Sequence, residues 1–91
     1  MKKVRYRYHE GQFNFKEDDY VTIVVHYLYV DDPEKELYYH GTLKQIDSVG
    51  FHAVLDDDKS KEQYFAFADI EKVVPGHYMP FLGGYTRRKD M

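Results

Sequence analysis

The sequence predicts an all-β protein: a small, strongly bent antiparallel barrel with a β-hairpin before it and an irregular tail after it. Three observations lead to this prediction. Apolar and polar residues alternate with a period of two, the alternating runs are short and separated by turn residues, and ten Tyr and six Phe supply the aromatic content. Tyr and β-branched residues favour half-buried sheet faces, and short strands at regular intervals are typical of small barrels.

A chain of 91 residues suits one domain. Within it we expect an N-terminal hairpin at 1–16, a barrel at 20–74 and a tail at 75–91. No apolar run is long enough to span a membrane as a helix, and no signal-peptide pattern follows the basic start. These features predict a cytoplasmic protein without a membrane partner.

The N-terminal segment has the pattern of a hairpin. Val4, Tyr6 and Tyr8 alternate with polar residues in the first strand. A turn is expected at 10–12, and Phe13 and Phe15 alternate with polar residues in a return strand. Because an isolated hairpin is marginally stable in water, this one must pack on the barrel or on a partner.

The segment 20–30 is the strongest strand of the chain. Both of its faces are largely apolar or aromatic, which predicts a central strand. A turn at 31–35 leads into a returning strand at 36–46. Gly41 lies in the middle of that strand and predicts a bulge or a sharp bend.

The remaining elements follow at short intervals. After a turn at 47–50 we expect a strand at 51–55, a solvated acidic loop at 56–62, a strand at 63–67, a tight turn at Ala68-Asp69 and a last strand at 70–74. Pro75-Gly76 ends the sheet, and the residues from 77 onward show no clean period.

The segments Val21–Val24, Gly41–Asp47, Phe51–Leu55 and Phe65–Val73 together resemble the YolD-like family, small bacterial and phage proteins with an Sm-like or SH3-like barrel. The resemblance covers residues 20–74. It implies an accessory protein, carried in some members by mobile elements alongside DNA-damage polymerases, without known catalytic residues. The family's usual N-terminal helical region is missing here, so no partner is carried over. By analogy of fold alone, Sm-like barrels bind RNA or other proteins, often as oligomers.

Two patterns suggest metal chemistry and then fall short of it. If the turn around Pro33 closes a symmetric hairpin, His26 and His40 face each other and can bind a metal or sense pH, but no third ligand lies nearby. The run Asp56, Asp58 and Ser60 begins like a calcium loop but lacks its Gly and its closing Glu. We therefore expect ordinary sheet residues and a solvated loop, with no metal.

No pattern predicts catalysis. Ser48 and Ser60 lie in turns without the context of a nucleophile, and no carboxylate lies in an apolar run that shifts its pKa. Gly83-Gly84 lacks the Lys and the helix of a phosphate loop, and there is no Cys. We expect no enzyme activity and no cofactor.

The charges are unevenly placed along the chain. Residues 1–16 carry five basic side chains against one acidic, and residues 17–86 carry fourteen acidic against five basic. An acidic body argues against a duplex-DNA binder. We expect a protein-binding regulator or adaptor, for which inhibition of a host protein is one form that the resemblance implies. The alternative is a single-stranded RNA binder, because aromatic rings interleaved with Arg can stack bases.

The two ends of the chain carry the residues expected to contact a partner, because Tyr, Phe and Arg dominate interface hot spots. These residues are Arg5, Tyr6, Arg7, Tyr8, Phe13, Phe15, Tyr78, Phe81, Tyr85, Arg87 and Arg88. Their rings exceed what one small barrel covers, so self-association into a homo-oligomer is also expected.

Overall fold

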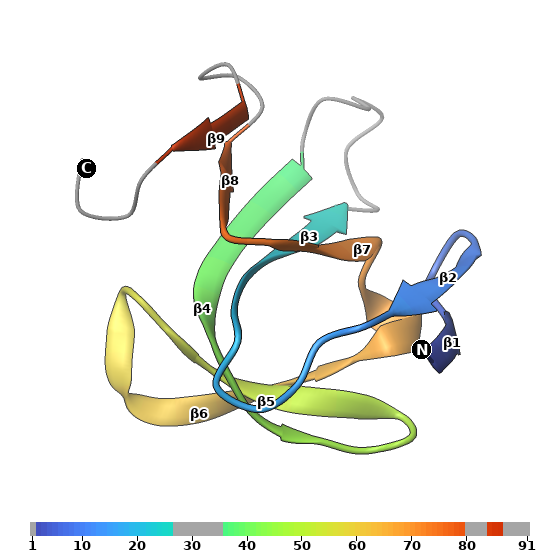
Figure 1. Ribbon diagram of the computed structural model, residues 1–91, viewed down its shortest axis with the longest axis horizontal. Coiled ribbons are helices and arrows are strands. Elements are labelled where there is room, and N and C mark those ends of the chain that lie inside the picture. Colours follow the sequence, from blue (N-terminus) through green and yellow to red (C-terminus); the bar gives the residue numbers. More distant parts are fainter. Residues whose placement is uncertain (1, 27–35, 80–83, 87–91) are drawn as a thin grey trace.

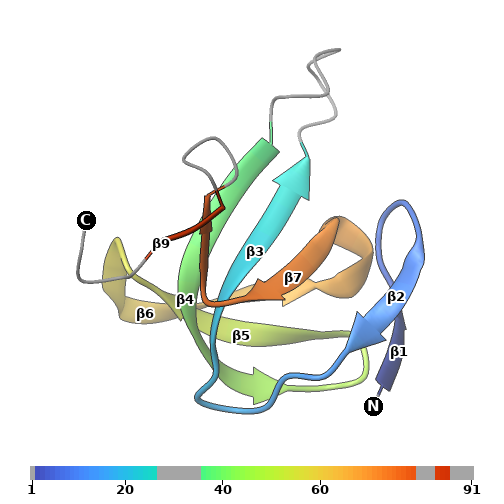
Figure 2. The ribbon, with the colours of Figure 1, turned by 45° about the horizontal axis from the view of Figure 1, so that its top comes forward.

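A computed structural model describes residues 2–26, 36–79 and 84–86 (Figures 1 and 2). The elements in order are β1 (Lys2–Arg5), β2 (Glu10–Phe13), β3 (Tyr20–His26), β4 (Glu36–Ile46), β5 (Gly50–Leu55), β6 (Asp58–Ala66), the 3-10 turn η1 (Phe67–Asp69), β7 (Lys72–Pro75), β8 (His77–Met79) and β9 (Gly84–Thr86). All strand pairings among them are antiparallel, which confirms the all-β prediction.

Five of these strands form one sheet in the order β6-β5-β4-β3-β7. Strand β3 lies between β4 and β7, so the predicted central position of this strand is confirmed. Its residues Val21, Thr22, Ile23 and Val24 are all buried, as a strand covered on both faces requires. The sheet curls strongly around its own axis (Figure 1), and within the described residues β6 and β7 form its two open edges.

The register of β3 against β4 differs from the predicted one. Thr22 faces His40, and His26 faces Glu36, so the predicted pairing of His26 with His40 is wrong. The shift from His26 to Thr22 is an even number of residues, which leaves every side chain on its expected face. Alternation alone therefore cannot distinguish the two registers. Residues 27–30 of the predicted strand and the predicted turn at 31–35 lie outside the described part of the chain.

Gly41 is required by a close approach between strands. A Cβ at this position would lie 2.3 Å from the backbone oxygen of Val54 on β5, so no other residue fits without a backbone shift. The bend of β4 follows shortly after, where the pairing with β5 slips between Leu43 and Gln45. The predicted irregularity in this strand is therefore present, a few residues beyond the glycine.

The predicted acidic loop at 56–62 is wrong. The chain turns at Asp56-Asp57 and re-enters the sheet at Asp58, so β6 is nine residues long. Its polar residues follow no alternation because β6 is an edge strand with exposed side chains over most of its length. Charged residues such as Lys59 and Lys61 are common on edges, where they discourage unwanted pairing.

The N-terminal hairpin exists, but its turn lies earlier than predicted. β1 pairs with β2 so that Lys2 faces Phe13 and Arg5 faces Glu10. The turn covers the residues between Arg5 and Glu10 and is closed by a bond from the Tyr6 amide to the His9 carbonyl. The Arg7 amide then donates to the carbonyl of Ile70, which ties the turn to the segment between η1 and β7.

The hairpin supplies part of the hydrophobic core. Val4, Tyr6 and Phe13 are buried in the same cluster as Phe51 and Phe67 from the sheet and η1. The predicted tight turn at Ala68-Asp69 is confirmed as the 3-10 turn η1, which carries Phe67 into that core. A hairpin that is marginal alone thereby becomes a fixed part of the domain.

The C-terminal residues are more regular than predicted. β8 and β9 form a two-stranded antiparallel sheet in which His77 faces Thr86 and Met79 faces Gly84. The prediction of an irregular tail is therefore wrong for these residues. Gly76, at a φ of 72°, makes the corner between β7 and β8, a conformation that glycine adopts without strain.

Candidate functional site

The predicted contact residues fall into three groups. Tyr6 and Phe13 are only 2% and 3% exposed, so they belong to the core and not to the surface. Arg5 and Tyr8 are exposed, and Arg7, Phe15 and Tyr78 are half-buried. Of Tyr85 the backbone alone is described, in β9, and Phe81, Arg87 and Arg88 lie outside the described residues.

The two buried rings are held by other rings. Phe13 stacks on Phe51 at 5.7 Å and meets Phe67 edge-on at 5.0 Å between ring centroids. Tyr6 also meets Phe67 edge-on, at 6.1 Å, and its burial raises its pKa to about 12. Such pairs add to the stability that burial already provides, so these residues hold the hairpin in place. The surface that the hairpin leaves open is made by its neighbours.

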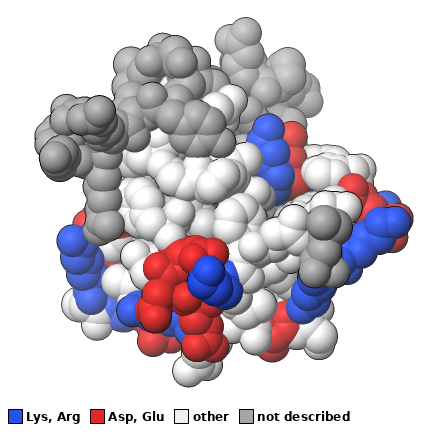
Figure 3. All heavy atoms as spheres, viewed as in Figure 1, with Lys and Arg blue, Asp and Glu red and all other residues white. Residues whose placement is uncertain are grey.

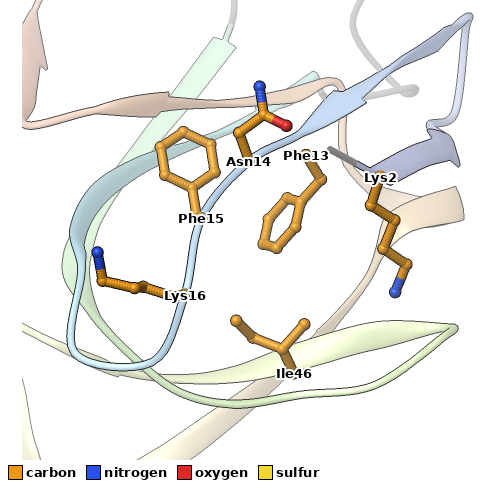
Figure 4. Close-up of a pocket in the computed structure, with 6 residues that line it drawn as sticks. All are labelled: Lys2, Phe13, Asn14, Phe15, Lys16 and Ile46. Atoms are coloured by element: carbon orange, nitrogen blue, oxygen red, sulfur yellow. The ribbon is translucent and has the colours of Figure 1, made fainter.

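An open groove with a volume of about 500 Å³ lies beside the hairpin. It is lined by Lys2, Phe13, Asn14, Phe15, Lys16 and Ile46 (Figure 4). Figure 4 shows Lys2 and Lys16 on opposite sides, with Phe13 and Ile46 between them. Phe15 packs edge-on against Phe13 at 5.3 Å, so the apolar floor is continuous. A small apolar floor between charged rims is a common form of binding site.

Lys2 is the fixed rim of this groove. Its Nζ donates a 2.9 Å hydrogen bond to the carbonyl oxygen of Asp47 and lies 5.4 Å from the centroid of the Phe67 ring. Both contacts hold the ammonium group over the junction of hairpin and sheet without neutralising its charge. The positive charge at this side of the groove is therefore preorganised.

A second hollow lies on the other side of β1. Its volume is about 290 Å³, and its lining is Lys3, Val4, Arg5, Ser48, Val49, Phe67 and Ala68. Val49 is 61% exposed, a large value for an apolar residue in a structured turn. Lys2 lines the first hollow, and Lys3 and Arg5 line the second.

The turn after β4 is rigid because of Asp47. Its carboxylate accepts the amide hydrogens of Val49 and Gly50, each at 2.7 Å, and these bonds lower the pKa of Asp47 below its usual value. The hydroxyl of Tyr64 on β6 also donates to this carboxylate. The bonds fix the turn that carries Val49, and so they fix one wall of the second hollow.

An acidic segment follows the groove residue Lys16 along the chain. Glu17, Asp18 and Asp19 follow Lys16 directly in the segment that leads into β3. Figure 3 shows carboxylates gathered over this segment, and basic side chains border the hairpin on the same face. Asp18 lies 3.6 Å from Lys44, and Asp19 accepts the amide hydrogen of Lys16. The groove itself is lined by Lys2 and Lys16 and by no carboxylate, and the acidic residues follow Lys16 outside its lining.

A second cluster lies where β8 crosses the sheet. The rings of His40 and His77 stack with centroids 3.7 Å apart and planes at 21°, and His77 is only 5% exposed. Between them and the sheet lies the buried hydroxyl of Thr22, which donates to the carbonyl of Gly76 at 2.7 Å and accepts from the Tyr78 amide at 2.9 Å. A 2.9 Å contact joins the same hydroxyl to Nδ1 of His40.

The hydroxyl has one hydrogen and two lone pairs, so these three bonds use its full capacity. Since its hydrogen goes to the Gly76 carbonyl, Nδ1 of the neutral His40 ring must carry a proton and donate to Thr22. Burial lowers the pKa of His40, the charge of His77 lowers it further, and the carboxylate of Asp56 acts in the opposite direction. The cluster is thus built to hold a neutral His40.

The residues of the two patterns that suggested metal chemistry make other contacts in the fold. His40 meets His77 instead of His26, and no group of three or more His, Cys, Asp or Glu side chains that could hold a metal lies among the described residues. In the run Asp56, Asp58 and Ser60, which begins like a calcium loop, Asp58 accepts hydrogen bonds from the amide and the hydroxyl of Ser60. Tyr20 donates a short bond to Asp56. These carboxylates are used within the fold.

Comparisons with protein-family models, with curated proteins and with solved structures gave no match. The resemblance to the YolD-like family therefore stays a prediction from the sequence. In the described part of the chain, no helix has the length and the apolar character needed to cross a membrane.

Sequence reasoning missed much of the groove. Lys2, Lys16 and Ile46 were not among the expected contact residues, because each is an ordinary residue of its own segment. Pairing brings them together: Lys2 faces Phe13 across the hairpin, and Ile46 ends the strand that passes below. The one available signal was the basic N-terminal segment.

Proposed function

We propose that this protein is a non-enzymatic protein-binding module of the cytoplasm, acting as a regulator or adaptor on a small barrel of the SH3-like or Sm-like type. The barrel type is supported by the strand order, in which β3 to β6 follow one another and β7 returns to pair with β3 after the 3-10 turn η1. The resemblance to the YolD-like family suggests an accessory protein of phages or mobile elements that modulates a host protein.

The observation that carries the proposal is the groove beside the hairpin. It offers an apolar floor of Phe13, Phe15 and Ile46 with a lysine at each side. Interfaces gain most of their affinity from a few desolvated apolar contacts and gain their selectivity from the polar rim. The groove has both features.

The groove suits a protein better than a nucleic acid. Base stacking requires an exposed ring face, yet Phe13 is buried and Phe15 is half-buried. The net charge of the whole chain is −3, so a polyanion gains no overall electrostatic attraction to the protein.

The proposal is tested by affinity capture from host cells with three versions of the protein. These are the unchanged protein, Phe15→Ala and the matched control Phe65→Ala. Both phenylalanines are partly buried rings packed against the core, but Phe15 lines the groove and Phe65, on β6, does not. Their thermal unfolding is compared first, so that loss of binding is separated from loss of folding.

We expect one discrete protein to be recovered by the unchanged protein and by Phe65→Ala but not by Phe15→Ala. Recovery that is equal for all three, or the recovery of RNA that is lost at moderate salt concentration, would contradict a protein-binding groove.

A further inference from the structure

We propose that the free edge of β1 binds a short extended segment of a partner protein as a third strand of the N-terminal hairpin. The segment carries an acidic residue beside Lys3 and Arg5 and an apolar residue against Val49. This surface is separate from the groove and goes beyond the function proposed for it.

The second hollow lies along the edge of β1 that faces away from β2. Three consecutive residues of β1 line it, Lys3, Val4 and Arg5, although their side chains alternate between the two faces of the strand. None of the described residues of β2 lines it. Ser48 and Val49 in the turn after β4, together with η1, form the rest of its lining. The hollow therefore follows the side of β1 that has no strand partner among the described residues.

The register of the hairpin directs backbone groups of β1 into this hollow. Opposite residues of an antiparallel pair alternate between hydrogen-bonded and non-bonded pairs. The Tyr6 amide donates to the His9 carbonyl, which continues the register of β1 with β2. Val4, two residues before Tyr6, is therefore bonded to β2, and Lys3 and Arg5 direct their amide and carbonyl groups away from β2.

The next residue of this outward series already has a partner. The Arg7 amide donates to the carbonyl of Ile70, which occupies the edge at that point. Among the described residues, no backbone hydrogen bond joins Lys3 or Arg5 to the chain across the hollow. Unpaired amide and carbonyl groups on an edge strand are a template for a further strand.

The charges at this edge select an acidic segment. The side chains of Lys3 and Arg5 are exposed on one face of β1, and no carboxylate is among the described residues that line the hollow. Glu10 is opposite Arg5 on β2, but within the described residues neither cation forms an ion pair. An acidic residue on the added strand lies beside both cations. A second copy of β1 would instead place like charges opposite each other, which disfavours a dimer through this edge.

The other face of the added strand meets apolar side chains. Because Val4 packs into the core with Phe67, the matching face of a third strand lies over the apolar part of the lining. There Val49 is 61% exposed, and Ala68 is also exposed. The carboxylate of Asp47 fixes the turn that carries Val49, so this surface is preformed. A branched aliphatic side chain of the partner covers it and removes it from water. The period of two in a strand then predicts an acidic residue next to an apolar one.

The test is selection of peptides from a random display library on the immobilised protein, followed by measurement of the affinity of the enriched peptides by fluorescence anisotropy. We expect a class of peptides with alternating acidic and branched apolar residues. These should bind equally to the unchanged protein and to Phe15→Ala, which removes a ring of the groove. Peptides that lose affinity in Phe15→Ala report on the groove, so failure of one surface is distinguishable from failure of the other.

Two double variants give a matched comparison. Lys3→Glu with Arg5→Glu reverses two exposed cations of β1, and Lys59→Glu with Lys61→Glu makes the same change of charge on the edge strand β6. We expect the first variant to bind the acidic peptide about tenfold more weakly, because two exposed charge contacts are replaced by repulsion. The second should bind like the unchanged protein. Thermal unfolding of both is compared first, so that loss of binding is separated from loss of folding.

Val49→Asp is a second variant, which leaves the hairpin unchanged. It places a carboxylate on an exposed turn position that lines the hollow, so the acidic peptide should again bind about tenfold more weakly.

Hydrogen exchange distinguishes an added strand from attraction between side chains alone. When the peptide binds, exchange of the Lys3 and Arg5 amides should slow about tenfold or more, because both gain a strand partner. The Val4 amide, already directed at β2, should change less.

The inference is wrong if no peptide is enriched whose affinity falls in both Lys3→Glu with Arg5→Glu and Val49→Asp. It is also wrong if both double variants weaken binding equally, or if the Lys3 and Arg5 amides exchange as before. A dimer in light scattering that dissociates in the first double variant would assign the edge to a second copy. Displacement of the peptide by polyuridine RNA at physiological salt would assign the two cations to RNA, and either result would overturn the inference.

Discussion

At the scale of single residues, the buried hydroxyl of Thr22 connects β3 to the start of β8. It is hydrogen-bonded to the Gly76 carbonyl, the Tyr78 amide and Nδ1 of His40. These partners lie at the β7–β8 corner, in β8 and in β4. A buried polar group without a partner is costly, and here three partners share one hydroxyl. The Thr22 hydroxyl therefore helps to attach the C-terminal hairpin to the sheet, together with the bond from the Gly76 amide to the Tyr20 carbonyl and the stacked histidines.

Thr22→Val keeps the shape of this side chain and removes its hydroxyl. We expect the free energy of unfolding to fall by roughly 1–3 kcal/mol, since the buried partners lose their hydrogen bond. Chemical denaturation measures the change. Thr42→Val, at a half-buried position on β4, is the control and should change stability little. Equal losses for both variants would show that the three hydrogen bonds contribute nothing.

His40 should make stability depend on pH on the acid side. Its pKa is lowered in the folded protein, first by burial and then by His77, against the opposing charge of Asp56. The unfolded chain thus takes up a proton at higher pH than the folded protein does, so stability is full above about pH 6.5 and falls as the pH decreases below it.

Thermal unfolding at a series of pH values tests this direction. His40→Asn keeps a polar group near the position of Nδ1 but cannot titrate, so its melting temperature should fall less steeply below about pH 6.5. Parallel curves for His40→Asn and the unchanged protein would exclude His40 as the cause. His52→Asn, at an exposed pairing with Glu62 on the sheet, is the matched control.

At the scale of elements, the close contact of β4 with β5 depends on Gly41. A methyl group here meets backbone and not a flexible side chain, since the Val54 oxygen and the Leu55 Cα lie 2.3 and 2.9 Å from the added carbon. We expect Gly41→Ala to destabilise the protein by about 3 kcal/mol or more, because strands β4 and β5 must separate. Denaturant unfolding compared with Thr42→Ala checks this, and an unchanged midpoint would contradict the packing described here.

The elements also show what alternation in a sequence can predict. It predicts which residues share a face, and for β3 and β5 the buried positions are the expected ones. It does not predict register, because a shift by an even number of residues preserves both faces, as with His40 and Thr22. It predicted the second part of β6 as a strand at 63–67 but missed the first part, residues 58–62, where an edge strand carries exposed polar residues.

The hairpin illustrates a second limit. A hairpin was predicted, but its turn was placed at 10–12, residues that belong to β2 in the structure, instead of between Arg5 and Glu10. The deciding contacts are made with residues far along the chain: Arg7 donates to Ile70, and the His9 ring bonds to the carbonyl of Glu71 at 2.8 Å. Local patterns contain no information on such contacts, so the exposed aromatic surface expected of Tyr6 and Phe13 is in fact core.

At the scale of the whole molecule, the hairpin does two things at once. Its rings complete the core of a five-stranded sheet, and its cations and the neighbouring Phe15 and Lys16 form a surface beside that sheet. The sequence predicts partner contacts at both ends of the chain, and the groove that we propose as the binding site lies beside the N-terminal hairpin. The groove itself required the fold, since it combines β1, the segment after β2 and the end of β4.

The central claim, that this groove binds a protein segment, is tested most directly by chemical-shift mapping. Isotope-labelled protein is titrated with the partner protein recovered by affinity capture, and amide shifts are followed residue by residue. We predict that the largest changes fall on Phe13, Phe15, Lys16 and Ile46 and on the β1 strand, with little change in β8. Changes centred on β8 or on the β6 edge, with the groove unaffected, would contradict the claim.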